Sequence, residues 1–313
     1  MKKKNNRFLS DVIKYKALIL MGLPGVIWFV FFFYIPVFAN VVAFKDFRIS
    51  PDGFLASLHL SPWVGFENFK FLFSSNDAWL ITRNTLLYNI VFLFFNLFFA
   101  ISFAIIMSEL RNKKLVKVYH TMSLLPYFLS WVVISYFVYA FLSPDKGFLN
   151  QFIGFLGGEG VNWYADPKWW PLFFVILNSW KGLGYNSIIY YASVMGIDPT
   201  YYEAAMVDGA TKWQQIKNIT IPQIIPMMSV LLIMNIGGIF RADFGLFYSV
   251  PRNSGALYNV TAVLDTYIYN GLTATGDIGM TAAASLYQSA VGSVLLLAAN
   301  WVIRKIEPDS ALF

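Results

Sequence analysis

The sequence has no cysteine and only two histidines, His59 and His120, among its 313 residues. Without cysteine, neither a disulfide framework nor a thiolate metal site can form. Two isolated histidines also disfavour zinc ligation. We therefore expect no metal site in this chain.

Charged residues are scarce as well. They make up 13% of the chain and hydrophobic residues 58%, against about 25% and roughly 45–50% in soluble domains. This balance disfavours a water-soluble fold. The net charge of +6 does not indicate nucleic-acid binding, because the basic residues lie beside apolar blocks and do not alternate with aromatic residues.

Long apolar blocks dominate what remains. A helix needs about 20 mostly apolar residues to cross a bilayer, and several blocks are that long. The sequence predicts an all-α integral membrane protein with six transmembrane helices, near residues 17–44, 84–108, 118–142, 171–196, 222–241 and 281–303.

Basic residues predict the orientation. Lysine and arginine collect on cytoplasmic loops, and here they mark the tail 1–16, residues 111–117, Lys212 with Lys217, and Arg304 with Lys305. Both termini are therefore expected in the cytoplasm of a multi-pass cell-membrane protein. The apolar stretch after the tail is longer than that of a cleavable signal peptide, so we expect it to stay attached as an anchor, with a membrane domain over residues 17–313.

The connections predicted outside the cytoplasm are rich in tryptophan. Tryptophan commonly anchors membrane proteins at the bilayer interface, which we favour over a sugar-stacking platform. The tryptophans concerned are Trp63, Trp79, Trp163, Trp169 and Trp170.

The loop at 197–222 carries the most specific local signals. Asp198 is a good helix N-cap and Pro199 a good first helical residue. A helix over Thr200 to Asp208 should end at Gly209, whose backbone freedom suits the residue just past a helix end.

A second helix should start at Thr211. Thr211 and Gln214 have the spacing of a capping box, and the helix would carry Trp213 and Ile216 toward a span that begins at Pro222. Apolar residues exposed on a cytoplasmic loop indicate either a protein partner or contact with lipid headgroups. The local chemistry leaves both readings open.

The same loop resembles the signature of permease subunits from ATP-binding-cassette (ABC) importers. That signature reads Glu-Ala-Ala, three residues, Gly, nine residues, Ile, one residue, Leu-Pro, and only Ile221 in place of Leu departs from it. The resemblance implies an ATPase-coupling role for Glu203, Ala204, Ala205, Asp208, Gly209, Ile219 and Pro222.

Further segments resemble the carbohydrate-uptake branch, especially its polysaccharide and complex-oligosaccharide permeases. Among them are WVGFENFKFLF, WKGLGYNSIIYYASVMGIDPTYYEAAMVDGA and the closing SLYQSAVGSVLLLAANWVIRKIEPDSALF. The resemblance implies the type I ABC importer permease fold and import of an oligosaccharide or polysaccharide fragment by alternating access. It also implies three kinds of partner: two ATPase subunits, a second homologous permease and an extracytoplasmic solute-binding protein.

The chain itself has no P-loop of the form GxxxxGK[ST]. We therefore expect it to be a transport subunit and not an enzyme, with ATP and magnesium bound by the partner ATPases. In the family the loop forms a coupling helix in a groove of the ATPase, where Glu203 would face a basic residue.

Polar residues inside spans are costly and mark either a transport path or packing contacts between helices. The candidates for the substrate path are Asn178, Lys181, Tyr185, Asn186, Asn235, Tyr287 and Gln288. Lys181 is the most costly of them and should face protein or water. Arg241 could pair with Asp243 or attract an acidic sugar.

Two other classes compete with the permease. An ion-coupled secondary transporter would also suit six spans with polar residues inside, but no convincing internal repeat is visible. A membrane enzyme would need a carboxylate pair or a metal cluster, and acidic residues within the spans are almost absent. The signature loop favours the permease.

Overall fold

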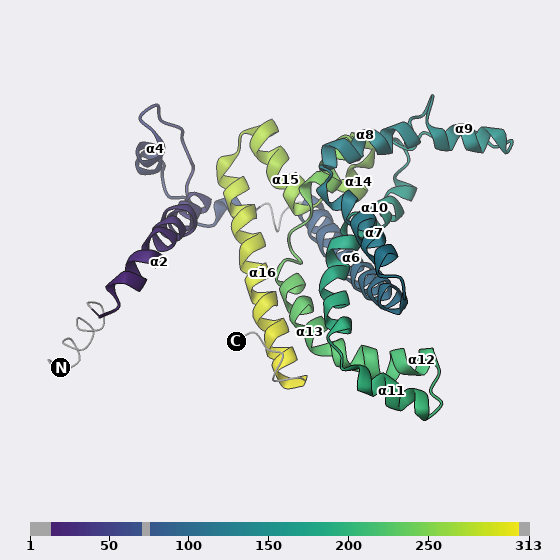
Figure 1. Cartoon of the computed structure of the whole chain (residues 1–313). Coiled ribbons are helices and arrows are strands. Elements are labelled where there is room, and N and C mark those ends of the chain that lie inside the picture. Colours follow the sequence, from purple (N-terminus) through teal and green to yellow (C-terminus); the bar gives the residue numbers. More distant parts are fainter. Residues whose placement is uncertain (1–13, 71–75, 307–313) are drawn as a thin grey trace. The chain divides into compact units, whose positions relative to one another are not determined.

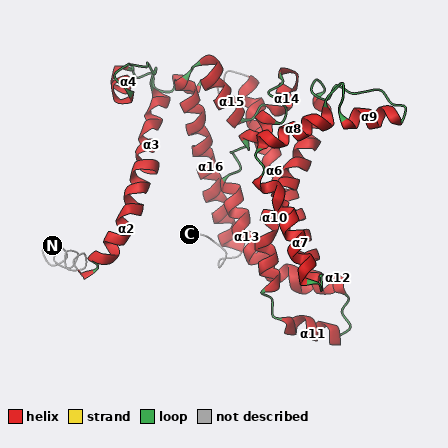
Figure 2. Cartoon of the chain, turned by 45° about the horizontal axis from the view of Figure 1, so that its top comes forward, coloured by secondary structure: helices red, strands yellow, loops and turns green. Residues whose placement is uncertain are grey.

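The computed structural model describes residues 14–70 and 76–306 and is helical throughout (Figures 1 and 2). Its described residues contain no strand, only one isolated antiparallel bridge between Lys45 and Trp63. The chain divides into two compact units. Among the described residues, the first comprises 14–70 together with 277–286, and the second comprises 76–276 together with 287–306.

The first unit begins with a helical run over Lys16–Phe44. Lys45 then ties the following loop together, because its ammonium donates to the carbonyls of Leu58 at 2.8 Å and Ser61 at 3.0 Å. The elements are α2 (Lys16–Phe29), η1 (Val30–Tyr34), α3 (Ile35–Phe38), η2 (Ala39–Phe44), α4 (Phe54–Leu60) and η3 (Glu67–Phe69). Helix α16 (Ile278–Ile306) belongs to the first unit through residue 286 and to the second beyond it.

The second unit holds the remaining helices. Its longer elements are α6 (Asn76–Glu109), α7 (Lys113–Phe128), α8 (Trp131–Leu142), α9 (Phe148–Phe155), α10 (Trp170–Met195), α11 (Pro199–Val207) and α13 (Ile221–Gly237). Its shorter elements are η4 (Pro167–Trp169), α12 (Lys212–Gln215), η5 (Ile216–Thr220), η6 (Gly245–Ser249), η7 (Gly255–Leu257), α14 (Tyr258–Thr261), α15 (Leu264–Asn270) and η8 (Gly271–Thr275). Helix α10 packs against α6, α7 and α13 (Figure 1).

Fewer helices qualify as spans by length and apolarity than the sequence predicts. In the described residues four qualify, Lys16–Phe44, Asp77–Glu109, Lys212–Gly237 and Ile278–Lys305, or five if the bent pair α7 and α8 forms one span. Helix α10 is long enough, at 26 residues, but its apolar sequence contains the polar residues Asn178, Lys181 and Asn186. Six spans therefore remain a prediction.

The expectation of one helix over 118–142 is wrong. The chain bends by 97° between α7 and α8, where Leu129 and Ser130 are extended. Ser130 caps the new helix, because its hydroxyl accepts a hydrogen bond from the Val133 amide at 3.3 Å. Helix α8 consequently runs across the end of α7 (Figure 2).

The expectation that a span begins at Pro222 also needs correction. Helix runs without interruption over Lys212–Gly237, and Pro222 lies within it. A proline ring crowds the carbonyl four residues earlier in an ordinary α-helix. Here the wider π-helical turn η5 comes directly before α13 and accommodates the proline. The helix ends at Gly237, short of the predicted residue 241.

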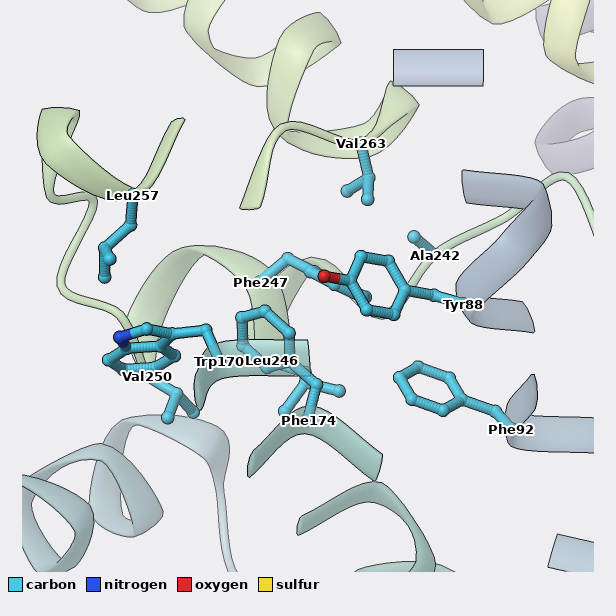
Figure 3. Packing of buried hydrophobic residues seen from close by; sticks show 10 residues of the cluster. All are labelled: Tyr88, Phe92, Trp170, Phe174, Ala242, Leu246, Phe247, Val250, Leu257 and Val263. Atoms are coloured by element: carbon cyan, nitrogen blue, oxygen red, sulfur yellow. The ribbon is translucent and has the colours of Figure 1, made fainter. Parts of the chain in front are cut away.

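An aromatic core joins α6 and α10 to the segment 242–263. Phe247 lies at its centre, with ring centroids 4.7 Å from Phe174 and 4.9 Å from Tyr88 (Figure 3). Trp170 is fully buried in this core, and its indole donates to the Trp163 carbonyl at 2.7 Å.

The interfacial role predicted for the tryptophans is therefore wrong at two positions. Trp163 and Trp170 are buried, and the indole of each donates a hydrogen bond inside the unit. Trp63, Trp79 and Trp169 remain exposed, as anchors at a membrane interface would be.

Candidate functional site

The loop between α10 and α13 folds as its sequence predicts. Asp198 caps α11, since its carboxylate accepts a hydrogen bond from the Thr200 amide at 2.9 Å. This hydrogen bond holds the pKa of Asp198 below its ordinary value, because it favours the charged form. The carboxylate therefore stays ionised at the positive end of the helix dipole.

Gly209 makes the turn between α11 and α12. Its φ of +77° lies in the left-handed region, and a Cβ atom there would meet no atom within 4 Å. Backbone conformation, and not lack of space, is what requires glycine here. The capping box predicted from Thr211 and Gln214 is present. The Tyr202 hydroxyl lies 2.9 Å from that of Thr220 and holds α11 against η5.

The predicted coupling residues follow one another along this turn. Glu203 and Ala204 are exposed on α11, Ala205 is half-buried, Asp208 is the C-cap, Ile219 is half-buried on η5 and Pro222 is exposed on α13. Glu203 forms no ion pair with any described residue. A carboxylate is therefore available for another chain.

Exposed apolar side chains share this loop with Glu203. Val207 is 88% exposed, and Tyr201, Met206 and Trp213 are also largely exposed. Exposed apolar side chains on a loop that also carries an unpaired carboxylate are typical of a surface that binds a protein partner.

A cavity of about 350 Å³ lies among α6, α10 and α13, and we call it the polar cavity because five asparagines interrupt its largely apolar wall. Four of the seven predicted path residues line it: Asn178, Tyr185, Asn186 and Asn235. Asn89 and Asn96 of α6 line it too, and the sequence analysis missed both. They are seven residues apart, which places them on one face of the helix. That spacing was the available signal within an otherwise apolar run.

Several polar groups of the cavity have no internal partner. The Asn96 amide nitrogen donates to Asn178 at 2.8 Å, but the Asn96 side-chain oxygen is buried without a partner in the described structure. The Asn186 amide makes no side-chain hydrogen bond to a described residue. Tyr185 presents an exposed ring stacked on Tyr127 with centroids 4.4 Å apart. Free amides beside a tyrosine face suit a hydroxyl-rich ligand.

The other three predicted path residues do not line this cavity. Tyr287 packs against Phe240, with ring centroids 5.9 Å apart. Gln288 is buried, and its amide donates to the Phe240 carbonyl at 2.7 Å and to Asp265 at 3.0 Å. These contacts join α16 to the segment after α13. Tyr287 and Gln288 therefore make packing contacts in this structure, and their place on the substrate path remains a prediction.

Lys181 occupies the bend between α7 and α8. Its ammonium donates to the carbonyls of Pro126 at 3.2 Å, Tyr127 at 2.9 Å and Leu129 at 2.5 Å. A cation at this position satisfies carbonyls that the end of α7 leaves unpaired. We expected Lys181 to face either protein or water. It faces protein, and it stabilises the bend.

Asp243 pairs with a tryptophan at the same bend. Its carboxylate accepts from the Trp131 indole at 2.6 Å and from the Gly245 amide at 3.0 Å. It forms no ion pair with Arg241, which is exposed. Of the two alternatives considered for Arg241, the local pair with Asp243 is therefore not present in the described structure.

Lys181→Met should destabilise the chain without weakening substrate binding. The substitution leaves carbonyls at the bend without a partner, at about 1–3 kcal/mol for an unsatisfied buried group. Thermal unfolding in detergent should shift downward, whereas the half-saturating substrate concentration of the assembled transporter should stay within twofold. Lys217→Met, at an exposed lysine, is the control. If the unfolding temperature stayed the same and the half-saturating substrate concentration rose, Lys181 would instead be a residue of the substrate path.

No group of three or more metal-binding side chains occurs among the residues that the structure describes. The side chains of the loop and of the cavity offer amides, hydroxyls, aromatic rings and exposed carboxylates.

Comparison with known proteins agrees with this arrangement. Residues 100–308 match the family model described as "Binding-protein-dependent transport system inner membrane component". The polygalacturonan/rhamnogalacturonan transport system permease protein YteP of Bacillus subtilis (strain 168) is 33% identical, over 97% of this chain and 92% of its own length. Protein LplB of the same organism is 30% identical, over 94% and 90%.

A solved structure has the same fold. A chain from the crystal structure of a bacterial ABC transporter involved in the import of the acidic polysaccharide alginate superposes with a TM-score of 0.86. The sequences are 32% identical, and the match covers 96% of this chain and 99% of that one. A second structure of a bacterial alginate ABC transporter, in complex with an alginate pentasaccharide-bound periplasmic protein, matches with a TM-score of 0.85.

The matched region contains both the loop around Glu203 and most of the residues that line the polar cavity. Such family members are transport subunits and not enzymes. The chain belongs to the family of binding-protein-dependent transport system inner membrane components, and is a multi-pass permease subunit of an ABC importer in the cell membrane.

Proposed function

We propose that this permease imports an oligosaccharide or polysaccharide fragment and that the polar cavity is part of its translocation path. The cavity carries this proposal, because the unpaired Asn96 oxygen of α6 meets the Asn186 amide and the exposed Tyr185 ring of α10 there. Its volume of about 350 Å³ lies at the lower end of the range for ligand pockets. It suits a short part of a sugar chain.

The exposed loop around Glu203 supports the binding of an ATPase subunit at this position. Two ATPase subunits bind ATP and magnesium, and one of them holds α11 of this chain in a groove. When they close, they draw the docked loops together, and the path alternates between inward-facing and outward-facing states. The residues of this contact are Glu203, Ala204, Ala205, Asp208, Gly209, Ile219 and Pro222. An extracytoplasmic solute-binding protein delivers the sugar on the opposite side.

The topology belongs to the same proposal. Six crossings with both termini in the cytoplasm place the loop 197–222 on the ATPase side, provided that α10 and the bent pair α7 and α8 each count as one crossing. A second homologous permease completes the path. The largely exposed apolar run Lys16–Phe44 is compatible with contact to lipid or to that second subunit.

The substrate class is supported by the relatives. The structural match imports alginate, an acidic polysaccharide, and a relative is named for polygalacturonan and rhamnogalacturonan transport. From these relatives we infer that the substrate of this importer is a sugar chain that carries carboxylates.

Asn186→Ala is expected to weaken substrate binding without changing stability. The Asn186 amide makes no side-chain hydrogen bond to a described residue, so its removal costs the fold little. Loss of one hydrogen bond to substrate, about 1 kcal/mol, should raise the half-saturating oligosaccharide concentration roughly fivefold. The measurement is ATP-dependent uptake by the reconstituted complex, with thermal unfolding followed in parallel.

Asn162→Ala provides the matched control, since Asn162 is exposed outside the cavity. Equal half-saturation in wild type and Asn186→Ala would remove the cavity from the path. Uptake driven by an ion gradient in vesicles that lack the ATPase would instead support the ion-coupled secondary transporter, the alternative class.

A further inference from the structure

A second polar groove lies away from the cavity, between α8 and the turn that follows η6. Its volume is about 250 Å³, and its lining combines hydroxyl, amide and guanidinium groups. The lining residues are Val132, Ser135, Tyr136, Tyr248, Ser249, Arg252 and Asn253. The proposed transport path does not account for this groove.

Arg252 supplies its only charged side chain. The guanidinium carbon lies 4.2 Å from the centre of the Tyr139 ring, a cation–π contact that orients the side chain. Arg252 is exposed and forms no ion pair with any described residue. Its hydrogen-bond donors are therefore available to an anionic ligand.

The backbone presents this arginine on a defined turn. Arg252 and Asn253 both lie in the left-handed region, with φ of 56° and 48°, and neither is glycine. The Asn253 amide donates to the Tyr248 carbonyl at 3.0 Å, and the Ser254 hydroxyl donates to the Tyr164 carbonyl at 2.9 Å. Non-glycine residues persist in this conformation where their surroundings fix them, often at ligand sites.

The surrounding groups match a sugar better than a simple anion. Tyr136 is 65% exposed and offers an aromatic face, while Ser249 and Asn253 offer a hydroxyl and an amide. A planar guanidinium binds a carboxylate through two parallel hydrogen bonds. We propose that this groove is a separate subsite for one carboxylate-bearing sugar unit, with Arg252 binding the carboxylate. The assignment rests on the proposed carbohydrate substrate.

Direct binding tests the subsite separately from transport. The full chain in lipid nanodiscs is titrated with galacturonic acid trimer and with a neutral galactose trimer, and binding is followed by saturation-transfer NMR. Arg252→Gln should weaken binding of the acidic trimer roughly tenfold and change that of the neutral trimer less than twofold. Arg252→Lys should fall between, because lysine keeps the charge but loses the paired geometry. Arg111→Gln is the control for losing one positive charge.

The outcomes separate the subsite from the importer. Equal binding of the acidic trimer by wild type and Arg252→Gln would overturn the subsite, even if the complex imports sugar. Arg252-dependent binding in a complex that imports no carbohydrate would keep the subsite and sink the proposed function. If Arg252→Gln left trimer binding unchanged but lowered uptake of both sugars equally, Arg252 would dock the binding protein, and the subsite would be wrong.

Discussion

Glu203→Ala is expected to abolish ATP-driven uptake while the chain still inserts and folds. Glu203 is exposed and has no ionic partner among the described residues, so the isolated permease loses little with it. Docking onto the ATPase would bury the carboxylate against a basic residue. Removing one member of a buried pair costs about 3–5 kcal/mol, which corresponds to a loss of more than about 100-fold in association.

Co-purification with the ATPase and uptake in proteoliposomes measure this effect. Glu159→Ala removes another exposed carboxylate, outside the coupling loop, and should leave both unchanged. Thermal unfolding of the permease alone should be the same for both variants. A well-inserted Glu203→Ala chain that retains the ATPase and full uptake would refute the coupling assignment.

Gly184→Ala is expected to disrupt the helix bundle. Gly184 is buried where α10 crosses α7, and a Cβ atom there would overlap the Ser123 carbonyl and lie 2.6 Å from the Leu124 nitrogen. Both neighbours are backbone atoms, so no rotamer change can make room. Overpacking usually costs 1–3 kcal/mol, and we expect about 3 kcal/mol or more here. Small residues are what allow membrane helices to approach this closely.

Gly154→Ala is the matched control for that substitution. Gly154 lies in α9, and a Cβ atom there would meet nothing within 4 Å. Alanine at position 154 should leave the free energy of unfolding unchanged or raise it by about 0.4–1 kcal/mol, because alanine restricts the unfolded chain more than glycine does. Detergent-resistant folded protein and its unfolding temperature compare the two. Equal stability of both variants would contradict the close crossing.

Local chemistry was sufficient to predict the coupling loop. Asp198 and Pro199 place the start of α11, Gly209 places its end, and Thr211 caps the next helix. Each of these signals acts within a few residues of the backbone that it shapes. The structure therefore reproduces the predicted loop closely, while the contact with an ATPase remains a prediction.

The bend at Leu129 and Ser130 could not be predicted in the same way. No proline or glycine stands at the break itself, and the carbonyls at the end of α7 are satisfied by Lys181, more than fifty residues away. Long-range contacts also decide which tryptophans are buried. Trp170 belongs to the core because α6 and the segment 242–263 close over it.

The uninterrupted helix over Lys212–Gly237 connects the loop around Glu203 directly to the polar cavity. At about 1.5 Å per residue, the stretch from Lys212 to Asn235 is about 35 Å long, so a tilt of about 5° at one end displaces the other by about 3 Å. Lys212 is also fastened to Glu109 of α6 by an ion pair of 2.8 Å, and Asn235 lines the polar cavity. If an ATPase moves the loop, the displacement would therefore reach the cavity wall along this one helix, which contains the π-helical turn η5 and Pro226.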